Sequence, residues 1–349
     1  MAGISGAAGQ VGPAFVLVTG LLLVGVVAEK DGLFAAAGAA LAHVPGGIRV
    51  TYVASLALVA VVTAILNLDT SVVFLTPVLL HLARTRGLDE TPFLYGAVFM
   101  SNAASLFLPG SNLTNLITLH GEHASGAAFF ARMWAAAIAA VIVTGIVVVC
   151  VFRRALDLAE AQVDERAPVR FGVGIVAVAV STVLVLTLAV PALPVLAVGA
   201  AAVLVDRVGY ARIHELDDLR VLGGLFVVAV ALGAVGRSWD GPASLLDHVG
   251  RVGTALGGAI AAVCVNNLPA AVLLTPHAPA HPRALLIGLN LGPNLAVTGS
   301  LSAYLWLRVA RSLGARPSLR TYSSVGVVLV PLSLGAALGA LWLVAPGRL

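Results

Sequence analysis

Long stretches of this chain are apolar without a break, and short polar segments separate them. Uninterrupted apolar runs occupy residues 11–28, 133–152 and 171–190. A helix rises 1.5 Å per residue, so about 20 apolar residues cross the roughly 30 Å hydrocarbon layer of a bilayer. These runs do not alternate between apolar and polar positions, as the strands of a membrane barrel do. The pattern therefore predicts membrane-spanning helices.

Two of the apolar stretches contain the same short polar phrase. Residues 67–77 read Asn-Leu-Asp-Thr-Ser-Val-Val-Phe-Leu-Thr-Pro, and residues 266–276 read Asn-Asn-Leu-Pro-Ala-Ala-Val-Leu-Leu-Thr-Pro. The helical pieces on either side are short for a full crossing, so we expect two re-entrant helical hairpins. Polar helix-breaking residues at bilayer depth are costly unless they line a cavity. The same interruption in both halves indicates a secondary transporter built from two repeats.

The rest of the pattern fits this organisation. Two further apolar segments are broken by Gly, Pro and Asn, and one long polar linker divides the chain. We predict an all-α polytopic membrane protein with two inverted repeats, each containing one re-entrant hairpin and one broken transmembrane helix. The expected boundaries are a first repeat at 13–152 (hairpin about 50–83, broken helix about 93–119), a cytoplasmic linker at 153–170, a scaffold helix pair at 171–205, and a second repeat at 219–345 (hairpin about 252–276, broken helix about 284–307).

Composition and charge agree with a membrane protein and suggest its orientation. The 349 residues are 60% hydrophobic and 10% charged, whereas soluble domains carry about 25% charged residues. If the loops after residues 28, 83, 152, 205 and 309 face the cytoplasm, 15 of the 20 Lys and Arg residues lie inside, as the positive-inside rule requires. This orientation opens the two hairpins to opposite sides of the membrane. It also places both termini outside.

Small polar residues gather at the four interruptions, where a helix break exposes unpaired backbone groups. The N-terminus of a half-helix carries partial positive charge and suits an oxygen-rich or anionic solute. An Asn at a break could instead satisfy only the local backbone. We expect no catalytic residues and no cofactor. The predicted solute and ion site comprises Asn67, Asp69, Thr70, Ser71, Ser111, Asn112, Asn115, Asn266, Asn267, Asn294, Thr298 and Ser300.

Asp69 is the one acid that this pattern places well inside the membrane. A buried carboxylate favours its protonated form, so Asp69 could carry a proton, or it could ligate Na⁺. The matching position of the second half is Leu268, which makes any ion site asymmetric. The competing interpretation is that Asp69 only caps a half-helix that begins at Thr70. No other metal site is expected.

The motifs at the interruptions resemble the bacterial arsenite-efflux permeases of the ion-transporter superfamily. The similarity covers nearly the whole chain and is most specific in the second half. Four departures fall at the expected site: Leu68 replaces an Asn of the family, Thr70 a Gly, Asn294 a Lys, and Ala296-Val297 a Thr-Pro pair. The motifs that carry the resemblance are Asp69-Thr70 with Leu75-Thr76-Pro77, Ala104-Ser105-Leu106 with Ser111-Asn112-Leu113, Asn266-Asn267-Leu268-Pro269, and Asn290-Leu291-Gly292-Pro293-Asn294 with Thr298 to Leu307.

The resemblance implies arsenite efflux in exchange for protons or another cation, across the inner membrane of a bacterium. It also implies the lipid bilayer, a homodimer and a separate ATPase subunit as partners, and no nucleic acid. Neutral arsenous acid is a small polyhydroxyl solute that suits Asn, Ser and backbone donors. The chain has only Cys150 and Cys264, so a site of three thiolates is impossible within one protomer. Transport is therefore expected to survive removal of both cysteines.

Three other functions remain open from the sequence. The first is a Na⁺/H⁺ antiporter of the same superfamily, with Asp69 as the ion ligand. The second is a carrier of dicarboxylates or other organic anions, although the Ser-Asn-Thr tips typical of that branch are absent. The third is a membrane scaffold or an intramembrane enzyme, for which we find no protease, hydrolase or nucleotide-binding motif.

Overall fold

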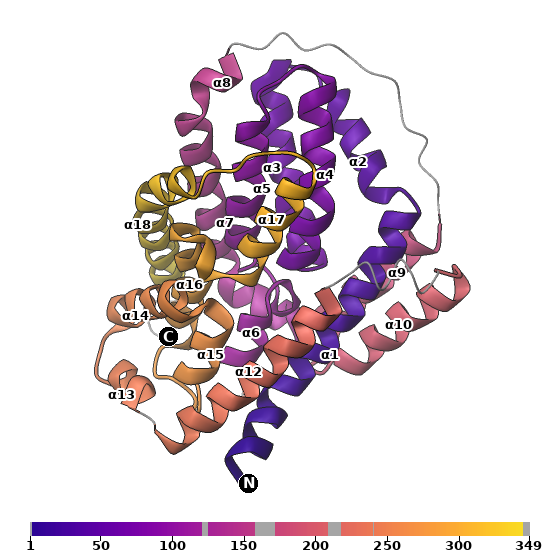
Figure 1. The fold of residues 1–349 in the computed structure, drawn as a ribbon. Coiled ribbons are helices and arrows are strands. Elements are labelled where there is room, and N and C mark those ends of the chain that lie inside the picture. The colour runs from indigo at the N-terminus through magenta and orange to yellow at the C-terminus, as the bar shows by residue number, and fades with distance from the viewer. Residues whose placement is uncertain (1, 121–124, 158–171, 209–217, 240, 345–349) are drawn as a thin grey trace.

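The chain folds into a bundle of helices, as seen in a computed structural model that describes residues 2–120, 125–157, 172–208, 218–239 and 241–344 (Figure 1). No strand occurs among these residues. Four helices have the length and hydropathy to cross a membrane, covering residues Gly3–Lys30, Gly47–Ile65, Gly126–Val151 and Leu319–Val344. The all-helical, apolar architecture agrees with the prediction from sequence.

The first half of the chain contains a long helix, a short helix, a helix pair, an interrupted helix and a second long helix. A short helix, α8 (Arg153–Asp157), begins the predicted linker, and the remainder of that linker lies outside the described residues. The bounds are α1 (Ala2–Lys30), α2 (Leu33–Ala42), α3 (Gly47–Ile65), α4 (Leu68–Thr85), α5 (Glu90–Ala104), η1 (Pro109–Ser111), α6 (Leu113–Thr118) and α7 (Gly126–Val151).

The second half repeats this order of elements after two apolar helices, α9 (Val173–Thr187) and α10 (Ala192–Val205). Two pairs of corresponding helices from the two halves contact each other. Helix α1 packs on α12, and α7 packs on α18. The bounds are α12 (Asp218–Ser238), α13 (Gly241–Asp247), α14 (Arg251–Val265), α15 (Asn267–Leu274), α16 (Pro282–Leu291), η2 (Gly292–Leu295), η3 (Val297–Gly299), α17 (Leu301–Ser312) and α18 (Leu319–Val344).

The outer helices expose apolar side chains in stripes. On α7 the exposed residues recur every fourth position, which marks one face of a helix. The opposite face of α7 is buried and contains small residues such as Ala136 and Ala140. An apolar outer face is what a helix surrounded by lipid requires, since lipid tails are its solvent. The exposed stripe consists of Phe130, Trp134, Ile138, Ile142 and Ile146.

The helix pair α9–α10 is fixed to α1 at close range. A Cβ atom on Gly199 would lie 2.6 Å from the carbonyl oxygen of Gly20, so the two backbones nearly touch. At the end of α1, the Asp31 carboxylate accepts a hydrogen bond of 2.6 Å from the backbone N–H of Gly174. Lys30 forms an ion pair of 2.7 Å with Asp206. The pair α9–α10 is therefore held along most of α1.

Several helix starts differ from the expected boundaries. We expected the first span to begin near residue 13, but α1 begins at Ala2 and includes Pro13. The residues before Pro13 are mostly small and apolar, so the helix continues through them despite the missing N–H of proline. Helix α4 begins at Leu68 rather than Thr70 because Asn67 supplies its cap. Similarly, α15, the second helix of the hairpin expected at about 252–276, begins directly after its own cap residue, Asn266.

Candidate solute and ion site

The turn between α3 and α4 is buried and polar. Asn67 is the N-cap residue of α4, and its Oδ1 accepts a hydrogen bond of 2.7 Å from the backbone N–H of Thr70. Asn67 Nδ2 and Thr70 Oγ1 are buried and have no hydrogen-bond partner among the described residues. Ser71 donates a long hydrogen bond of 3.4 Å to the carbonyl of Val59 on α3. This turn thus retains polar groups that can bind a solute or an ion.

Asp69 lies in the first turn of α4 and is 7% exposed. It is the only buried Asp or Glu among the residues whose burial the structure describes. Because Asn67 caps the helix, capping does not account for Asp69. Its Oδ1 accepts a short hydrogen bond of 2.5 Å from the hydroxyl of Ser302, in the first turn of α17. This contact joins the first helix pair to the interrupted helix of the other half.

The first interrupted helix is connected to the second through Asn290, on the last turn of α16. Asn290 Oδ1 accepts hydrogen bonds from Ser105 Oγ at 2.5 Å and from Asn112 Nδ2 at 2.7 Å. Asn290 Nδ2 donates to Asn115 Oδ1 at 2.8 Å and to the Leu286 carbonyl at 2.8 Å. All four hydrogen-bonding positions of this buried amide are therefore used. Asn290 fixes the two helix breaks relative to each other.

A second amide pair connects the same two elements. Asn102 Nδ2 on α5 donates to Asn294 Oδ1 in η2 at 2.9 Å, and both side chains are fully buried. Asn102 Oδ1 is buried without a partner among the described residues. The hydroxyl of Tyr322 on α18 donates to the carbonyl of Pro293 at 3.0 Å. The break at residues 292–295 is thus held from α5 on one side and α18 on the other.

The turn between α14 and α15 has unusual backbone geometry. Asn266 has φ 78° and ψ 146°, a combination with positive φ that costs a non-glycine residue about 1–3 kcal/mol. Its Oδ1 accepts from the N–H of Leu268 at 3.3 Å, and its Nδ2 donates to the carbonyl of Thr298 at 3.2 Å. Asn267 is buried at the start of α15. Asn266 thereby connects the α14–α15 turn to the interrupted helix of its own half. In the first half, Ser111 of the interrupted helix makes the corresponding connection, because its hydroxyl donates to the Ala64 carbonyl of α3 at 3.1 Å.

The four interruptions share one local chemistry. Each half-helix that begins at an interruption, α4, α6, α15 or α17, has a side-chain oxygen as its cap. Such a cap satisfies one of the N–H groups that a helix start leaves unpaired. The capping residues are Asn67, Asn112, Asn266 and Ser300.

The structure brings some of the predicted residues together and separates others. Asn112 and Asn115 share one buried network, and Asn294 pairs with Asn102 next to it. Thr298 is exposed and contributes only its carbonyl group. The sequence prediction of the site did not include Asn102, Ser105 or Asn290, whereas it counted Ser302 among the polar residues of the second broken helix. Ser105 and Asn290 belong to the motifs of the resemblance, so their position beside the breaks was a usable signal.

A cavity of about 170 Å³ reaches this network from one end of the molecule. Asn115 and Pro109 of the first interrupted helix line it, together with Gln10 of α1 and Arg132 of α7. Gln10 is buried and donates to the carbonyls of Ile117, at 3.2 Å, and Thr275, at 3.0 Å. Gln10 therefore holds the ends of α6 and α15 beside the cavity. The cavity is a candidate access route to the buried amides.

These features define a class of protein: a polytopic helical membrane protein with interrupted helices that meet at a buried polar centre, which is the construction of a secondary transporter. Comparison with known proteins agrees. A family model described as citrate transporter (CitMHS) matches residues 1–303. The chain belongs to this family of membrane transporters, which is part of the ion-transporter superfamily.

Individual relatives and a solved structure are also similar. An arsenical pump membrane protein of Escherichia coli is 25% identical over an alignment of 335 residues that covers 85% of this chain and 77% of that protein. The arsenical pump membrane protein of Shigella flexneri is 25% identical over an alignment of 321 residues that covers 81% of this chain and 74% of that protein. The YdaH transporter of Alcanivorax borkumensis, described as having an unusual topology, superposes with a TM-score of 0.61. That match covers 97% of this chain and 87% of the transporter at 15% identity, so it speaks for the fold alone.

Proposed function

We propose that this protein exports arsenite in exchange for protons. The observation that carries the proposal is the contact between Asp69 and Ser302, which places a buried carboxylate between the two halves of the chain. The two helix starts that carry this contact also contain Asn67, Thr70, Ser71 and Ser300, the kinds of neutral donor and acceptor that a small polyhydroxyl solute such as arsenous acid needs. The arsenical pumps to which the chain is similar support this choice of solute.

In this proposal, Asp69 binds the coupling ion and the amides bind the solute. Asp69 carries a proton in one conformation and is the ionised acceptor of the Ser302 hydrogen bond in the other, so that the proton and the solute cross the membrane in different conformations. Na⁺ is the other ion that a carboxylate with neighbouring hydroxyl and amide oxygens can ligate. Thr70 Oγ1, which has no partner among the described residues, is well placed in sequence to assist Asp69. The solute contacts fall to the remaining predicted residues: Asn67, Ser71, Ser111, Asn112, Asn115, Asn266, Asn267, Asn294 and Ser300.

A second candidate is transport of citrate or a similar organic anion, which the description of the matching family favours. A polyanion needs positive charge or several free backbone N–H groups. The only buried charged side chains among the residues of described burial are Asp69 and Arg86, and Asp69 would repel a polyanion. The electrostatics of the buried centre therefore favour a neutral solute.

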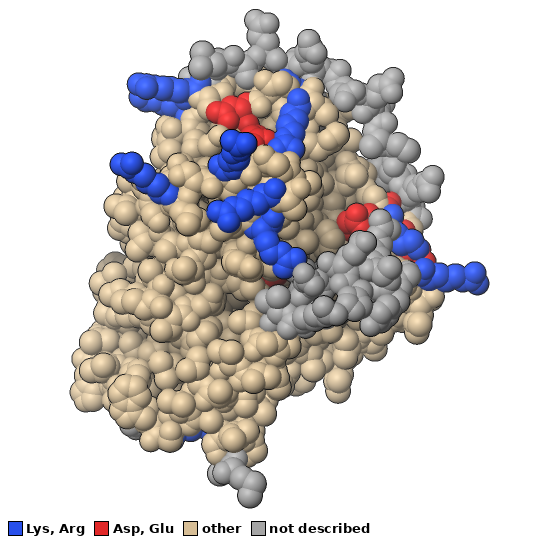
Figure 2. Space-filling view, in the orientation of Figure 1, with Lys and Arg blue, Asp and Glu red and all other residues tan. Residues whose placement is uncertain are grey.

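The distribution of charge supports the proposed orientation. Lys and Arg side chains gather at the end of the molecule that carries α8, whereas the opposite end shows few of them on the visible face (Figure 2). Arg84, Arg308 and Arg311, near the C-terminal ends of α4 and α17, are exposed. By the positive-inside rule this end is cytoplasmic. The recurring order of elements supports two inverted repeats, with the pairs α3–α4 and α14–α15 as the re-entrant hairpins.

Flux measurements in proteoliposomes test the proposal. Purified protein is reconstituted, and the uptake of arsenite, Na⁺ and citrate is followed with and without an imposed pH gradient. We expect arsenite flux that the gradient accelerates, with no comparable citrate flux. Citrate flux without arsenite flux would replace the first candidate with the second. Pure Na⁺/H⁺ exchange would assign the protein to the antiporters.

A further inference from the structure

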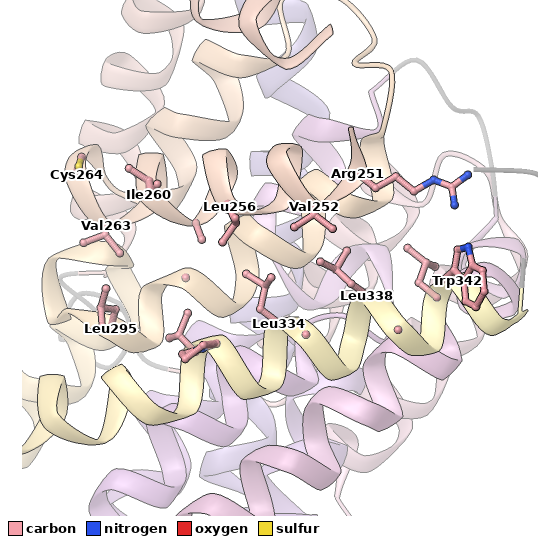
Figure 3. Close-up of a pocket in the computed structure, with 17 residues that line it drawn as sticks. Arg251, Val252, Leu256, Ile260, Val263, Cys264, Leu295, Leu334, Leu338 and Trp342 are labelled. Carbon is pink, nitrogen blue, oxygen red and sulfur yellow. The ribbon is translucent and has the colours of Figure 1, made fainter. Parts of the chain in front are cut away.

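An apolar groove lies apart from the polar centre, between α14 and α18. Its volume is about 810 Å³. Leu256 and Ile260 of α14 form one wall, and Leu334 and Leu338 of α18 form the other (Figure 3). Ile260 is 63% exposed. In a protein that spans the membrane, such a surface faces lipid tails.

The two ends of the groove differ chemically. Arg251, at the start of α14, and Trp342, near the end of α18, lie together at one end (Figure 3). Val263, Cys264 and Leu295 lie at the other end. Trp is enriched where the hydrocarbon meets the headgroups, and a cation at that level attracts a lipid phosphate. The Arg251 end therefore belongs at the membrane surface.

The length of the groove matches one leaflet. Residues 251 and 264 are 13 residues apart on one helix, which corresponds to about 20 Å. One leaflet contributes roughly half of the 30 Å hydrocarbon layer, and a tilted helix needs somewhat more length to cross it. A chain that starts at Arg251 would therefore end near mid-membrane. Cys264 is two residues before the Asn266 turn, so the inner end of the groove adjoins the predicted site.

The floor of the groove is open down to the backbone of α18. A Cβ atom on Gly335 or Gly339 would meet nothing within 4 Å. Two glycines four residues apart on a membrane helix can also receive a second helix. However, a second helix offers no group that complements the positive charge of Arg251 and the membrane-surface position of Trp342 at the end of the groove. An acyl chain with an anionic headgroup fits both the apolar walls and the positively charged end of the groove.

We propose that this groove binds one anionic phospholipid, with its phosphate at Arg251 and an acyl chain running between α14 and α18 to Cys264. The bound lipid packs against α14, the first helix of the α14–α15 pair, just before the turn at Asn266. The inference concerns binding and does not depend on which solute is transported.

The test uses two photoreactive lipids, phosphatidylglycerol and phosphatidylcholine, each with a diazirine at the end of one acyl chain. The protein is reconstituted in phosphatidylcholine vesicles containing one probe, irradiated and digested. We expect phosphatidylglycerol to label the peptide that contains residues 260–264 about fivefold more than phosphatidylcholine does, because one Arg near the surface attracts an anionic lipid by that factor. Equal labelling by the two probes would contradict the proposal.

Variants locate the lipid. Gly339→Leu and Gly335→Leu each fill the groove without meeting another residue at the Cβ position, and we expect either to reduce labelling to the phosphatidylcholine level. Gly223→Leu is the matched control, because Gly223 on α12 is equally open and lies outside the groove. Arg251→Gln should remove the preference for phosphatidylglycerol. Unchanged labelling in both groove variants would overturn the assignment. A cross-link between the α18 helices of two copies would also overturn it if Gly339→Leu abolishes that cross-link.

Discussion

At the scale of single residues, the buried centre is organised by side-chain amides. Asn290 shows how much one residue contributes, since it contacts both interrupted helices with all four of its hydrogen-bonding positions. Sequence reasoning identified the residues inside the interruptions but not this one, which lies in the last turn of α16 before the break. Its helical position alone does not show that the side chain reaches another element, and the motif that contains Asn290 was the only usable signal.

Replacing Asn290 with Ala should destabilise the protein. The substitution leaves the amides of Asn112 and Asn115 without their shared partner in a buried place, and each unpaired group costs about 1–3 kcal/mol. We expect the free energy of unfolding to fall by about 2–4 kcal/mol, measured by denaturant unfolding of purified protein in detergent. Thr298→Ala is the control, because Thr298 is exposed and should change stability by less than about 0.5 kcal/mol. Equal stability of both variants would show that the amide network contributes little.

Asp69 and Ser302 should act as one unit in transport. Ser302→Ala removes the hydrogen bond of 2.5 Å to the carboxylate, and we expect it to slow arsenite efflux about tenfold, corresponding to roughly 1.4 kcal/mol. In the Asp69→Asn background the same substitution should have little further effect, since residues in contact are not additive. Ser312→Ala on the exposed part of α17 is the control. Additive losses would mean that the two residues serve different steps.

At the scale of helices, apolar periodicity predicted most elements correctly. The breaks at Asn67, Asn112 and Asn266 were expected, because polar residues and prolines cannot continue a helix through lipid without compensation. The helix starts were less accurate, since a cap is chosen by local hydrogen bonding: Asn67, rather than Asp69, caps α4. Trp306 is another case. Its indole N–H donates to the Leu94 carbonyl at 2.9 Å, a contact across 212 residues that periodicity does not reveal.

The contact between α1 and α10 should tolerate no added methyl group. In Gly199→Ala the new Cβ would lie 2.6 Å from the carbonyl oxygen of Gly20, and neither backbone can yield easily. We expect a loss of about 1–3 kcal/mol in unfolding free energy and a lower melting temperature. Gly9→Ala on α1, where the added Cβ meets nothing within 4 Å, should be neutral or stabilise the helix slightly. A neutral Gly199→Ala variant would show that the two helices are not packed this closely.

At the scale of the whole molecule, the sequence predicted an integral membrane transporter and its family, and the comparisons confirm both. It could not reveal which helices pair between the halves. The packing of α1 on α12 and of α7 on α18 depends on the shapes of complete helix faces (Figure 1). Orientation, inverted repeats, re-entrant hairpins and oligomeric state remain predictions, because the protein alone does not define the membrane plane.

Accessibility to a membrane-impermeant thiol reagent tests the orientation. We introduce one cysteine into protein that lacks Cys150 and Cys264, either by Arg311→Cys at the basic end or by His248→Cys between α13 and α14. Both positions are exposed. In intact cells we expect the reagent to label position 248 but not position 311, and in inverted vesicles the reverse. The opposite labelling pattern would place the basic end outside and contradict the proposed topology.

The most direct test of the central claim is arsenite transport by Asp69→Asn protein in proteoliposomes with an imposed pH gradient. Asparagine keeps the size of the aspartate side chain, but it cannot bind or release a proton. The account predicts that the wild-type protein accumulates arsenite when the gradient is applied. It predicts that the Asp69→Asn protein only equilibrates arsenite and gains nothing from the gradient. Full gradient-driven accumulation by the Asp69→Asn protein would show that the coupling group is elsewhere.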